Sequence, residues 1–337
     1  MATILTNKHD IPEVFFKACL IDKHVTRGDI STTQLIDAPQ IRRLRAEHDI
    51  EEDVSDRIWM LFGTAVHHVL ERAEIGHFQA RHLMEAAEIL NEGSEDEQKV
   101  AQWIIKKTKD KFPEVFQSKD LIENTMSIIV DGWEISGTID KYDFERKTLQ
   151  DYKVTGSWAY VYEEAKKKWY AQQNIYAYML RQNGYEVNNA EIIAVFKDWS
   201  KFNGMRNKDY PKSPVMSIPV KLLPDEDILK YLKSRVRKHK ASVAGDNIPC
   251  TAKERWATSE QWAVKKPNGK RAVRVLPTEE LADAFIAENE GFSYSGLYKE
   301  FRPGEQKRCD SFCPVRELCP QKKAFDAAYN VEELKTK

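Results

Sequence analysis

The stretch SGTIDKYDFERKTLQDYKV, from Ser136 to Val154, carries the strongest indication of the fold of this chain. Two runs rich in β-branched and aromatic residues surround the polar link ERK, which is the pattern of a β-hairpin. Because residues two apart in a strand point to the same face, Asp151 and Lys153 share a face, and Asp140 on the neighbouring strand can face them. A hairpin does not need these three side chains to fold. They are therefore candidates for chemistry, with a surface salt-bridge ladder as the alternative.

The two carboxylates of this hairpin suggest a metal site. Acidic groups a few ångströms apart repel each other and raise each other's pKa unless a cation lies between them. Oxygen-rich sites of this kind suit Mg²⁺ or Mn²⁺. We therefore expect Asp140 and Asp151 to bind a divalent cation, and we expect Lys153 to act on a phosphate or a water beside it.

The elements around the hairpin follow the order helix, three strands, helix, strand. Apolar residues at helical spacing alternate with short β-rich runs bounded by turn residues, which indicates a mixed α/β fold. A second hairpin, turning at Asn268 and Gly269, and a short helix are expected near the C-terminus. The other expected elements are a helix over 54–75, a helix over 95–111, strands between 121 and 154, a helix over Val161–Gln182, strands within 190–199 and 215–222, and a basic helix ending near Ala244.

Changes in composition along the chain divide it into three parts. We predict an N-terminal helical segment over 1–50, a core domain over 51–245, and a small α+β segment rich in cysteine over 246–337. The sequence AGDNIP, before the third part, is a plausible boundary because it clusters turn-forming residues.

Composition excludes some classes of protein. The chain has 337 residues and a formal net charge of −1, and its mean hydropathy is −0.60. No apolar run approaches the roughly 20 residues that span a bilayer, and the N-terminus does not resemble a signal peptide. We expect a cytoplasmic protein that does not bind membranes, in which the five cysteines are poor candidates for disulfides.

Positive charge is clustered although the net charge is near zero. The clusters could form a basic channel for nucleic acid, or they could be ordinary solvated faces of helices and hairpins. Near the second of them, Trp158, Tyr160, Trp169 and Tyr170 could stack on exposed bases or belong to the core. The clusters lie at 106–111, 165–169, 233–240 and 265–274.

Two helices carry polar pairs at i, i+4 spacing, which places each pair on one face. In the first, His67 precedes Glu71, and Gly63 lies one turn earlier. A neutral imidazole can bind Mn²⁺ beside carboxylates, although the adjacent His68 makes the assignment ambiguous. In the second, Gln172 precedes Tyr176, and these two could equally be a polar edge beside a core stripe.

The order of these motifs resembles the RecB-type branch of the PD-(D/E)XK nuclease superfamily. The resemblance spans roughly residues 55–200, and it is the combination of motifs that makes it specific. It implies the αβββαβ core of that family, in agreement with the expected order of elements. The four motifs are Gly63 to His67, Gly137 to Asp140, Asp151 to Lys153, and Gln172 to Tyr176.

The resemblance also implies a role for each motif residue. Asp140 and Asp151 would be the acidic metal ligands, His67 a further ligand, and Lys153 the catalytic lysine. Tyr152 would offer its backbone carbonyl to the metal, while Gln172 and Tyr176 would support the lysine and the DNA backbone. From spacing alone, we expect Glu71 to orient His67.

The cysteines form a second candidate metal site. Cys309, Cys313 and Cys319 lie within eleven residues, and four thiolates are the usual requirement of a [4Fe–4S] cluster or a structural zinc. The fourth is Cys250 or Cys19. Iron–sulfur relatives such as the AddAB nuclease domain and CRISPR-associated nucleases have three cysteines after the core and one before it.

This chain departs from those relatives at the position of the fourth cysteine, where it has Ala38. Cys250 is the simplest replacement, because it shares the C-terminal part with the other three. We therefore expect a [4Fe–4S] cluster on Cys250, Cys309, Cys313 and Cys319, with Zn²⁺ as the alternative.

Together these features predict a metal-dependent deoxyribonuclease, most specifically an exonuclease for DNA recombination, repair or processing. The resemblance extends to phage-encoded exonucleases, which would work in the cytoplasm of a bacterial host. Partners would be DNA, single-stranded or with free ends, and a helicase or single-strand annealing protein. The chain has no G-x-x-x-x-G-K-[ST] loop, so ATP-driven movement would come from a partner. The alternatives are an enzyme acting on small phosphate esters and a non-catalytic iron–sulfur or zinc DNA-binding module.

Overall fold

The computed structural model describes residues 3–21, 27–73, 93–111, 119–289 and 294–327, with residues 86, 89, 90 and 291. Contacts between residues divide the chain into two units. The larger unit consists of residues 4–36 and 51–240, and the smaller of residues 1–3, 37–50 and 241–337. The two units describe which segments of the chain contact one another. The domain boundaries expected at 50 and 245 stay a prediction.

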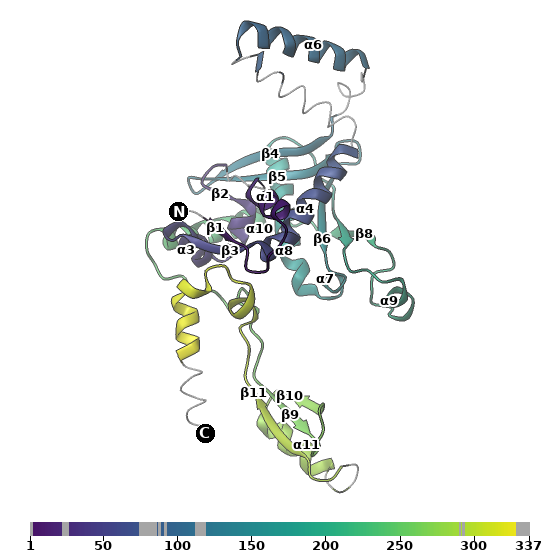
Figure 1. Cartoon of the computed structure of the whole chain (residues 1–337), viewed down its shortest axis with the longest axis vertical. Helices are drawn as coiled ribbons and strands as arrows, with labels where there is room; N and C mark the ends of the chain where they lie inside the picture. The colour runs from purple at the N-terminus through teal and green to yellow at the C-terminus, as the bar shows by residue number, and fades with distance from the viewer. Residues whose placement is uncertain are drawn as a thin grey trace. The chain divides into compact units, whose positions relative to one another are not determined.

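A mixed six-stranded sheet forms the centre of the larger unit (Figure 1). β6 and β7 are parallel, as a helical crossover between them requires, whereas β4, β5 and β6 are joined as antiparallel hairpins. The predicted α/β fold class is therefore confirmed. The strands of the sheet are β2 (Ile30–Ser31), β4 (Leu121–Val130), β5 (Trp133–Asp143), β6 (Thr148–Thr155), β7 (Asn189–Phe196) and β8 (Val215–Val220).

The order α4, β4, β5, β6, α8, β7 is the expected αβββαβ order. The helix expected over Val161–Gln182 begins at Glu163 instead, because Tyr162 is extended and separates it from a preceding helical turn. Two short helices, α7 and α9, were not expected. The helices of the larger unit are α1 (Glu13–Ile21), α2 (Thr32–Ile36), α4 (Val54–Ala73), α6 (Glu95–Lys111), α7 (Trp158–Val161), α8 (Glu163–Gln182), α9 (Lys201–Arg206) and α10 (Asp225–Val243).

Local sequence explains the turns on either side of the sheet core. Asp131 and Gly132 have φ values of 48° and 75°, which is the conformation of the two-residue type I′ turn that matches the twist of a hairpin. α8 ends before Gly184, whose φ of 85° suits the left-handed residue that closes a helix. The N–H of Tyr185 donates to the carbonyl of Leu180 there, at 3.0 Å.

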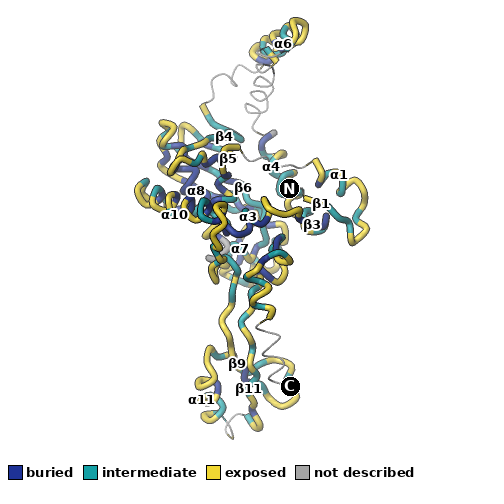
Figure 2. The backbone as a smooth tube through the Cα atoms, turned by 90° about the vertical axis from the view of Figure 1, so that its left-hand side faces the viewer, coloured by how far each residue is buried: buried dark blue, intermediate teal, exposed yellow. Residues whose placement is uncertain are grey.

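The core of the larger unit lies between the sheet and α8, where buried residues are concentrated (Figure 2). Ile175 and Met179 of α8 are four residues apart and thus lie on one face of the helix. They belong to the same buried cluster as Ile139, Leu149 and Ile192 of the sheet, and all five are fully buried. This packing fixes α8 against β5, β6 and β7.

One edge of β5 is interrupted in the middle of the sheet. β2 pairs with this strand at Ile135 and Ser136, and β6 pairs with it only from Lys141 to Asp143. In these ladders, residues 137–140 lie between the two partners, while β4 pairs along the opposite edge. The interruption therefore falls on the G-x-x-D motif.

The smaller unit contains a three-stranded antiparallel sheet with a helix against it. The predicted hairpin is confirmed, since β9 and β10 pair around a turn at Asn268, and the predicted helix is α11. Strands β1 (Thr3–Thr6) and β3 (Ile50–Asp53) extend from one unit into the other. The elements of the smaller unit are α3 (Pro39–Glu47), β9 (Gln261–Lys265), β10 (Ala272–Leu276), α11 (Glu279–Asn289), β11 (Tyr298–Arg302), a π-helical turn η2 (Arg308–Phe312) and a 3-10 turn η3 (Arg316–Leu318).

Among the helices that the structure describes, none combines the length and the apolar character needed to cross a membrane.

Candidate active site

The hairpin of β5 and β6 opens beside Asp140. Its ladder ends at Lys141 and Gln150, although the next pair in register would be Asp140 and Asp151. The strands separate there, and the backbone N–H of Tyr152 donates a 2.6 Å hydrogen bond to the Asp140 carboxylate. In a strand the N–H and C=O of one residue point to the same side, so the Tyr152 carbonyl also faces this opening. The separation thus places two acidic side chains and the Tyr152 carbonyl together.

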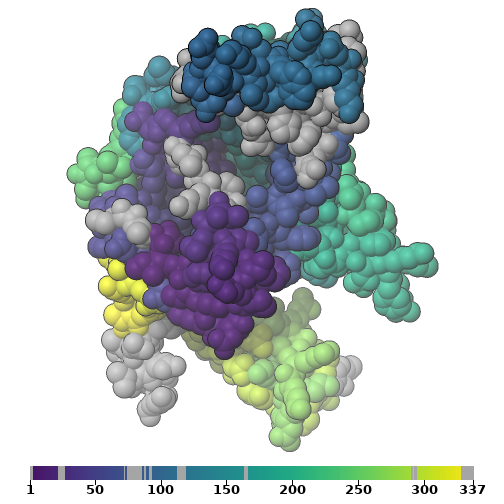
Figure 3. All heavy atoms as spheres, turned by 45° about the horizontal axis from the view of Figure 1, so that its top comes forward, coloured from purple at the N-terminus to yellow at the C-terminus, as the bar shows by residue number. Residues whose placement is uncertain are grey.

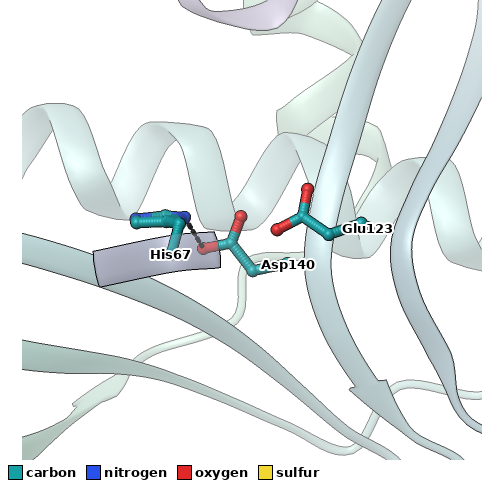
Figure 4. A group of neighbouring side chains, drawn as sticks. All are labelled: His67, Glu123 and Asp140. Atoms are coloured by element: carbon teal, nitrogen blue, oxygen red, sulfur yellow. Dashed lines mark ion pairs between the residues drawn. The ribbon is translucent and has the colours of Figure 1, made fainter. Parts of the chain in front are cut away.

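Two further side chains join Asp140 from neighbouring elements. His67 of α4 lies with its Nδ1 3.7 Å from the Asp140 carboxylate. Glu123 of β4 lies between Ile122 and Asn124, which pair with Lys141 and Ile139 on either side of Asp140. One ligand atom from each of the three lies within 4.8 Å of the others. Figure 4 shows His67 and Glu123 approaching Asp140 from opposite sides. Sequence reasoning missed Glu123, whose only signal was an acid at the start of an apolar strand.

Asp151 and Lys153 project from β6 into the same opening. The Lys153 Nζ lies 2.7 Å from the Asp151 carboxylate, which is only 2% exposed in its side chain. Apart from this ion pair, neither carboxylate oxygen of Asp151 has a hydrogen-bond partner among the described residues. A buried carboxylate with so few donors is poorly satisfied, and a cation would satisfy it.

Charge and burial disfavour ionisation of Asp140. Burial raises the pKa of Asp140 well above its ordinary value, and the negative charge of Asp151 raises it further. Lys153 and the N–H of Tyr152 lower the pKa but do not outweigh burial. An acid in this setting holds its proton unless a cation replaces it.

The polar pair of α8 lies beneath this group of acids. Gln172 Nε2 donates a 3.0 Å hydrogen bond to the Tyr176 hydroxyl, and both residues are buried. Burial raises the pKa of Tyr176, and the nearby Asp151 and Asp140 raise it further. The hydroxyl therefore stays protonated. A role for these two residues in supporting the lysine and the DNA backbone, which the resemblance implies, stays a prediction.

Gly137 makes room for the Tyr176 ring. A Cβ at this position would lie 2.4 Å from Tyr176 Cε1 and 2.9 Å from Thr32 Oγ1. Any larger residue would have to displace the tyrosine, which explains why the G-x-x-D motif has a glycine at this position. Gly63 on α4 differs, since a Cβ there would meet no described atom within 4 Å. Among the described residues, the packing therefore gives no steric reason for a glycine at position 63.

The start of α4, which carries His67, is fixed by a buried cap. Asp53 accepts hydrogen bonds from the backbone N–H and hydroxyl of Ser55, and from Thr6 and the N–H of Lys8. Burial alone would raise the pKa of Asp53, but these hydrogen bonds outweigh it and hold the pKa well below its ordinary value. An N-terminal cap of this kind sets the start of the helix and with it the position of His67.

The surroundings of His67 differ in part from those expected. Its ring lies edge-on to the ring of Tyr152, with centroids 6.0 Å apart. Glu71 was expected to orient His67, but the ion pair that the structure gives for Glu71 joins it to His68, at 3.5 Å. A role for Glu71 in orienting His67 stays a prediction.

The residues at the opening fit a divalent cation. The donor set combines an imidazole, three carboxylates and the Tyr152 carbonyl, which are ligands that Mg²⁺ and Mn²⁺ accept. The unsatisfied oxygens of Asp151 and the raised pKa of Asp140 are both relieved when a cation is bound. Lys153 lies beside Asp151, where it can reach a phosphate bound at the same place.

Four of the five cysteines gather in the smaller unit, and all are free thiols. Burial raises the pKa of Cys250 to about 12, and Glu254, Cys319, Cys309 and Cys313 add to the effect through their charges. The structure thus places Cys250 beside the three clustered cysteines. Cys19 lies on α1, in the larger unit.

Neighbouring side chains contact two of the four cysteines. Gln40 Nε2 contacts the Cys319 sulfur at 3.4 Å, and the Gln321 side chain bonds both the N–H and the carbonyl of Cys250. Ala38 is buried in the same cluster as Cys250 and Cys319. The methyl group of Ala38 therefore lies near these cysteines, at the position to which the resemblance assigns a fourth cysteine.

Comparison with known families and structures places this geometry in context. The sequence matches the family model of the PD-(D/E)XK nuclease superfamily over residues 40–320. A solved structure of SSO0001 is 14% identical with a TM-score of 0.34, over 67% of this chain and 85% of that chain. A solved structure from Eubacterium rectale, named "Putative exonuclease", is 14% identical with a TM-score of 0.28, over 54% of this chain and 69% of that chain. Similarity this distant says nothing about activity.

The search of curated proteins gives no match. The family model, however, covers well over half of the sequence and includes Asp140, Asp151 and Lys153. The acids and the lysine at the opening of the sheet also have the chemistry of a metal-dependent hydrolase. The chain belongs to the PD-(D/E)XK nuclease superfamily.

Proposed function

We propose that this protein is a metal-dependent DNA nuclease, and more specifically an exonuclease of the RecB type that acts in DNA recombination, repair or processing. One observation carries the nuclease proposal: Lys153 and the unsatisfied Asp151 stand at the break in the sheet beside Asp140. The choice of an exonuclease, and of phage-encoded relatives, rests on the resemblance of the motifs.

The protein would position a phosphodiester for attack by water. A divalent cation held by His67, Asp140 and Asp151, with the Tyr152 carbonyl, would polarise the phosphate and lower the pKa of water. The Tyr152 N–H fixes the orientation of the Asp140 carboxylate. Glu123 supplies one more carboxylate on the side of Asp140 opposite His67.

Lys153 would stabilise the charge that develops on the phosphate in the transition state. Its ammonium is already held by Asp151 at 2.7 Å, so little reorganisation is needed. Gln172 and Tyr176 form the floor of the site, and Gly137 admits the tyrosine ring to that position.

The direct test is cleavage of end-labelled DNA by wild-type protein and by Lys153→Ala. Single- and double-stranded substrates, linear and circular, are incubated with Mn²⁺, Mg²⁺ or EDTA. We expect metal-dependent loss of linear DNA, intact circles, and at least a hundred-fold slower cleavage by the variant, since a lost transition-state donor costs about 10²–10³. Full activity in a folded Lys153→Ala protein would refute the catalytic assignment, and cut circles would refute the exonuclease.

A non-catalytic DNA-binding module would have no need for a lysine beside an unsatisfied buried acid. It would bind DNA with unchanged affinity after Lys153→Ala and would cleave nothing with any metal. A helicase or annealing protein as partner stays a prediction from the resemblance.

We further propose that Cys250, Cys309, Cys313 and Cys319 hold a [4Fe–4S] cluster. The four thiols are close enough to interact electrostatically, and four thiolates are the ligand set of either a [4Fe–4S] cluster or zinc. The choice of the cluster over zinc rests on the resemblance of the motifs.

Metal analysis of anaerobically purified protein tests this second proposal. We expect a brown protein with about four irons per chain, as four-cysteine ligation implies. A colourless protein with one zinc per chain would establish the alternative.

A further inference from the structure

A row of exposed aromatic residues lies in the larger unit, on α4, which carries His67, and on the segments that follow β6 and β7. Trp59 on α4, Trp158 on α7, Tyr162 between α7 and α8, and Phe202 on α9 each expose 50–62% of their surface. Single exposed apolar residues are common, but several exposed aromatic residues close together mark a binding surface. Of the other aromatic residues considered from sequence, Tyr160, Trp169 and Tyr170 pack against the core.

The row begins close to the catalytic lysine. β6 ends at Thr155, two residues or about 7 Å beyond Lys153. There the N–H of Lys197 donates to the Thr155 carbonyl at 2.9 Å. The Lys197 ammonium lies 3.6 Å from the centre of the Trp59 ring. The Lys197 ammonium and the exposed Trp59 ring therefore lie together near the end of β6.

Trp158 is held firmly although it is half exposed. The preceding residue, Ser157, donates its N–H and its hydroxyl to the Asp198 carboxylate at 2.6 and 2.8 Å. Tyr210 donates its hydroxyl to Ser157 at 2.9 Å, and its ring lies edge-on to the Trp158 ring. The indole is therefore prepositioned, so little conformational entropy is lost when a ligand stacks on it.

The segment that follows β7 adds positive charge to this surface. Residues 197–212 contain five lysines and arginines against two aspartates, and one of the aspartates, Asp198, is engaged by Ser157. The Arg206 guanidinium lies 4.2 Å from the ring centre of Phe202. In Figures 1 and 3 the segment around α9 stands out at the edge of the larger unit.

We propose that this surface, formed by Trp59, Trp158, Tyr162, Lys197, Phe202 and Arg206, binds single-stranded DNA and leads it into the active site. The inference rests on the proposed nuclease function and adds the strandedness of the substrate. Unpaired bases stack on exposed aromatic rings while lysines and arginines follow the phosphates. In a duplex the base faces are covered, so a duplex would use only the charges.

The test measures binding apart from cleavage. Full-length protein carrying Asp151→Asn is titrated in EDTA against a fluorescent single strand and against a duplex of the same sequence, by anisotropy at one fixed salt concentration. Into this background are placed Trp158→Ala, Trp158→Phe, Trp59→Ala and the matched control Trp103→Ala. Trp103 is 61% exposed on α6, outside the proposed surface. Thermal unfolding establishes that each variant is folded.

We expect Trp158→Ala and Trp59→Ala each to weaken single-strand binding by about 5- to 100-fold, the effect of losing one stacked base. Trp158→Phe should restore most of the affinity, and Trp103→Ala should change nothing. Duplex binding should fall less than two-fold in every aromatic variant.

Unchanged single-strand affinity in folded Trp158→Ala and Trp59→Ala proteins would overturn the inference, and the surface would then suit a protein partner. Equal losses for single strand and duplex would overturn it as well. Because the binding protein is inactive by design, failure of the nuclease proposal is a separate result. If the wild type cuts no DNA while single-strand binding still depends on Trp158, the nuclease proposal fails and the proposed DNA-binding surface stands.

Discussion

The acidic group in the larger unit and the thiol group in the smaller unit solve the same electrostatic problem in different ways. In both, burial raises the pKa of the potential ligands, Asp140 in one and Cys250 in the other, so neither set ionises readily alone. Both groups mix buried and partly exposed members: His67 and Glu123 are partly exposed in one, and Cys250 and Cys313 in the other. They differ in their donor atoms. Carboxylates and an imidazole suit a divalent cation that exchanges during turnover, whereas four thiolates suit a metal that holds structure.

This contrast predicts opposite responses to removing one ligand. Asp140→Asn should reduce cleavage by at least about 10³-fold, because both a metal ligand and the group fixed by Tyr152 are lost. The same change should raise the unfolding temperature of the metal-free protein at neutral pH, since it removes a buried carboxyl beside Asp151. Cleavage rates and calorimetry in EDTA measure the two effects.

A folded Asp140→Asn protein with more than a tenth of wild-type activity would contradict the assignment of Asp140. His68→Ala is the matched control, because His68 is more than half exposed in its side chain and faces Glu71. Its cleavage rate should stay within two-fold of wild type.

The thiol group should respond to ligand loss through stability. Cys250→Ser should abolish most of the bound iron and lower the free energy of unfolding of the smaller unit by several kcal/mol, because metal binding and folding are coupled. Ala38 is buried among the same thiols. We therefore expect Ala38→Cys to restore iron to the Cys250→Ser protein.

Iron content and thermal unfolding of the single and double variants measure this exchange of ligands. Cys19→Ser is the control, and it should keep its iron. A Cys250→Ser protein with full iron content would show that another residue is the fourth ligand.

Two glycines of the motifs sharpen the comparison within the acidic site. Gly137→Ala should destabilise the protein by about 1–3 kcal/mol and slow cleavage, because its Cβ overlaps the Tyr176 ring. Gly63→Ala should stabilise by about 0.5–1 kcal/mol, since alanine suits a helix interior better and the added Cβ meets no described atom within 4 Å. Denaturant unfolding measures both, and equal signs would contradict the described packing.

The smallest effect concerns the cap that positions α4. Asp53 has a folded-state pKa below its ordinary value of 3.8, so its stabilising effect is present above about pH 4 and is lost as the pH falls through the folded-state value. Asp53→Ala should therefore cost about 0.5–2 kcal/mol at pH 7 and progressively less below pH 4. Urea unfolding across this range tests the slope, and a difference that grows towards low pH would contradict it.

Sequence patterns were sufficient for most of the fold. The hairpin of β5 and β6, the helix that carries Gln172, and the β9–β10 turn at Asn268 follow from alternation, helical spacing and turn residues. These are local signals, and the hydrophobic core in the larger unit reinforces them. The short helix α9 has no such pattern, because none of its residues is buried.

The site was only partly predictable because its decisive feature is that Asp140 and Asp151 do not pair in the β5–β6 ladder. Nothing local in the sequence shows that the β5–β6 ladder ends between Lys141 and Asp140. Glu123 was missed for a similar reason. It has a φ of 46°, which is uncommon for a residue that is not glycine, and a strand distorted at that point hides the alternation by which it would be recognised.

The position of the cysteines has a consequence for proteolysis. Cys250 and Cys309 flank the whole β9–β11 lobe, including the exposed turn at Asn268. If the four thiols share a metal centre as proposed, a protease that nicks this turn leaves two polypeptides still joined through that centre. They would migrate as one species in gel filtration and as two after denaturation. Loss of the metal to an oxidant would then leave the pairing of β10 and β11 with β9 to hold the two fragments together.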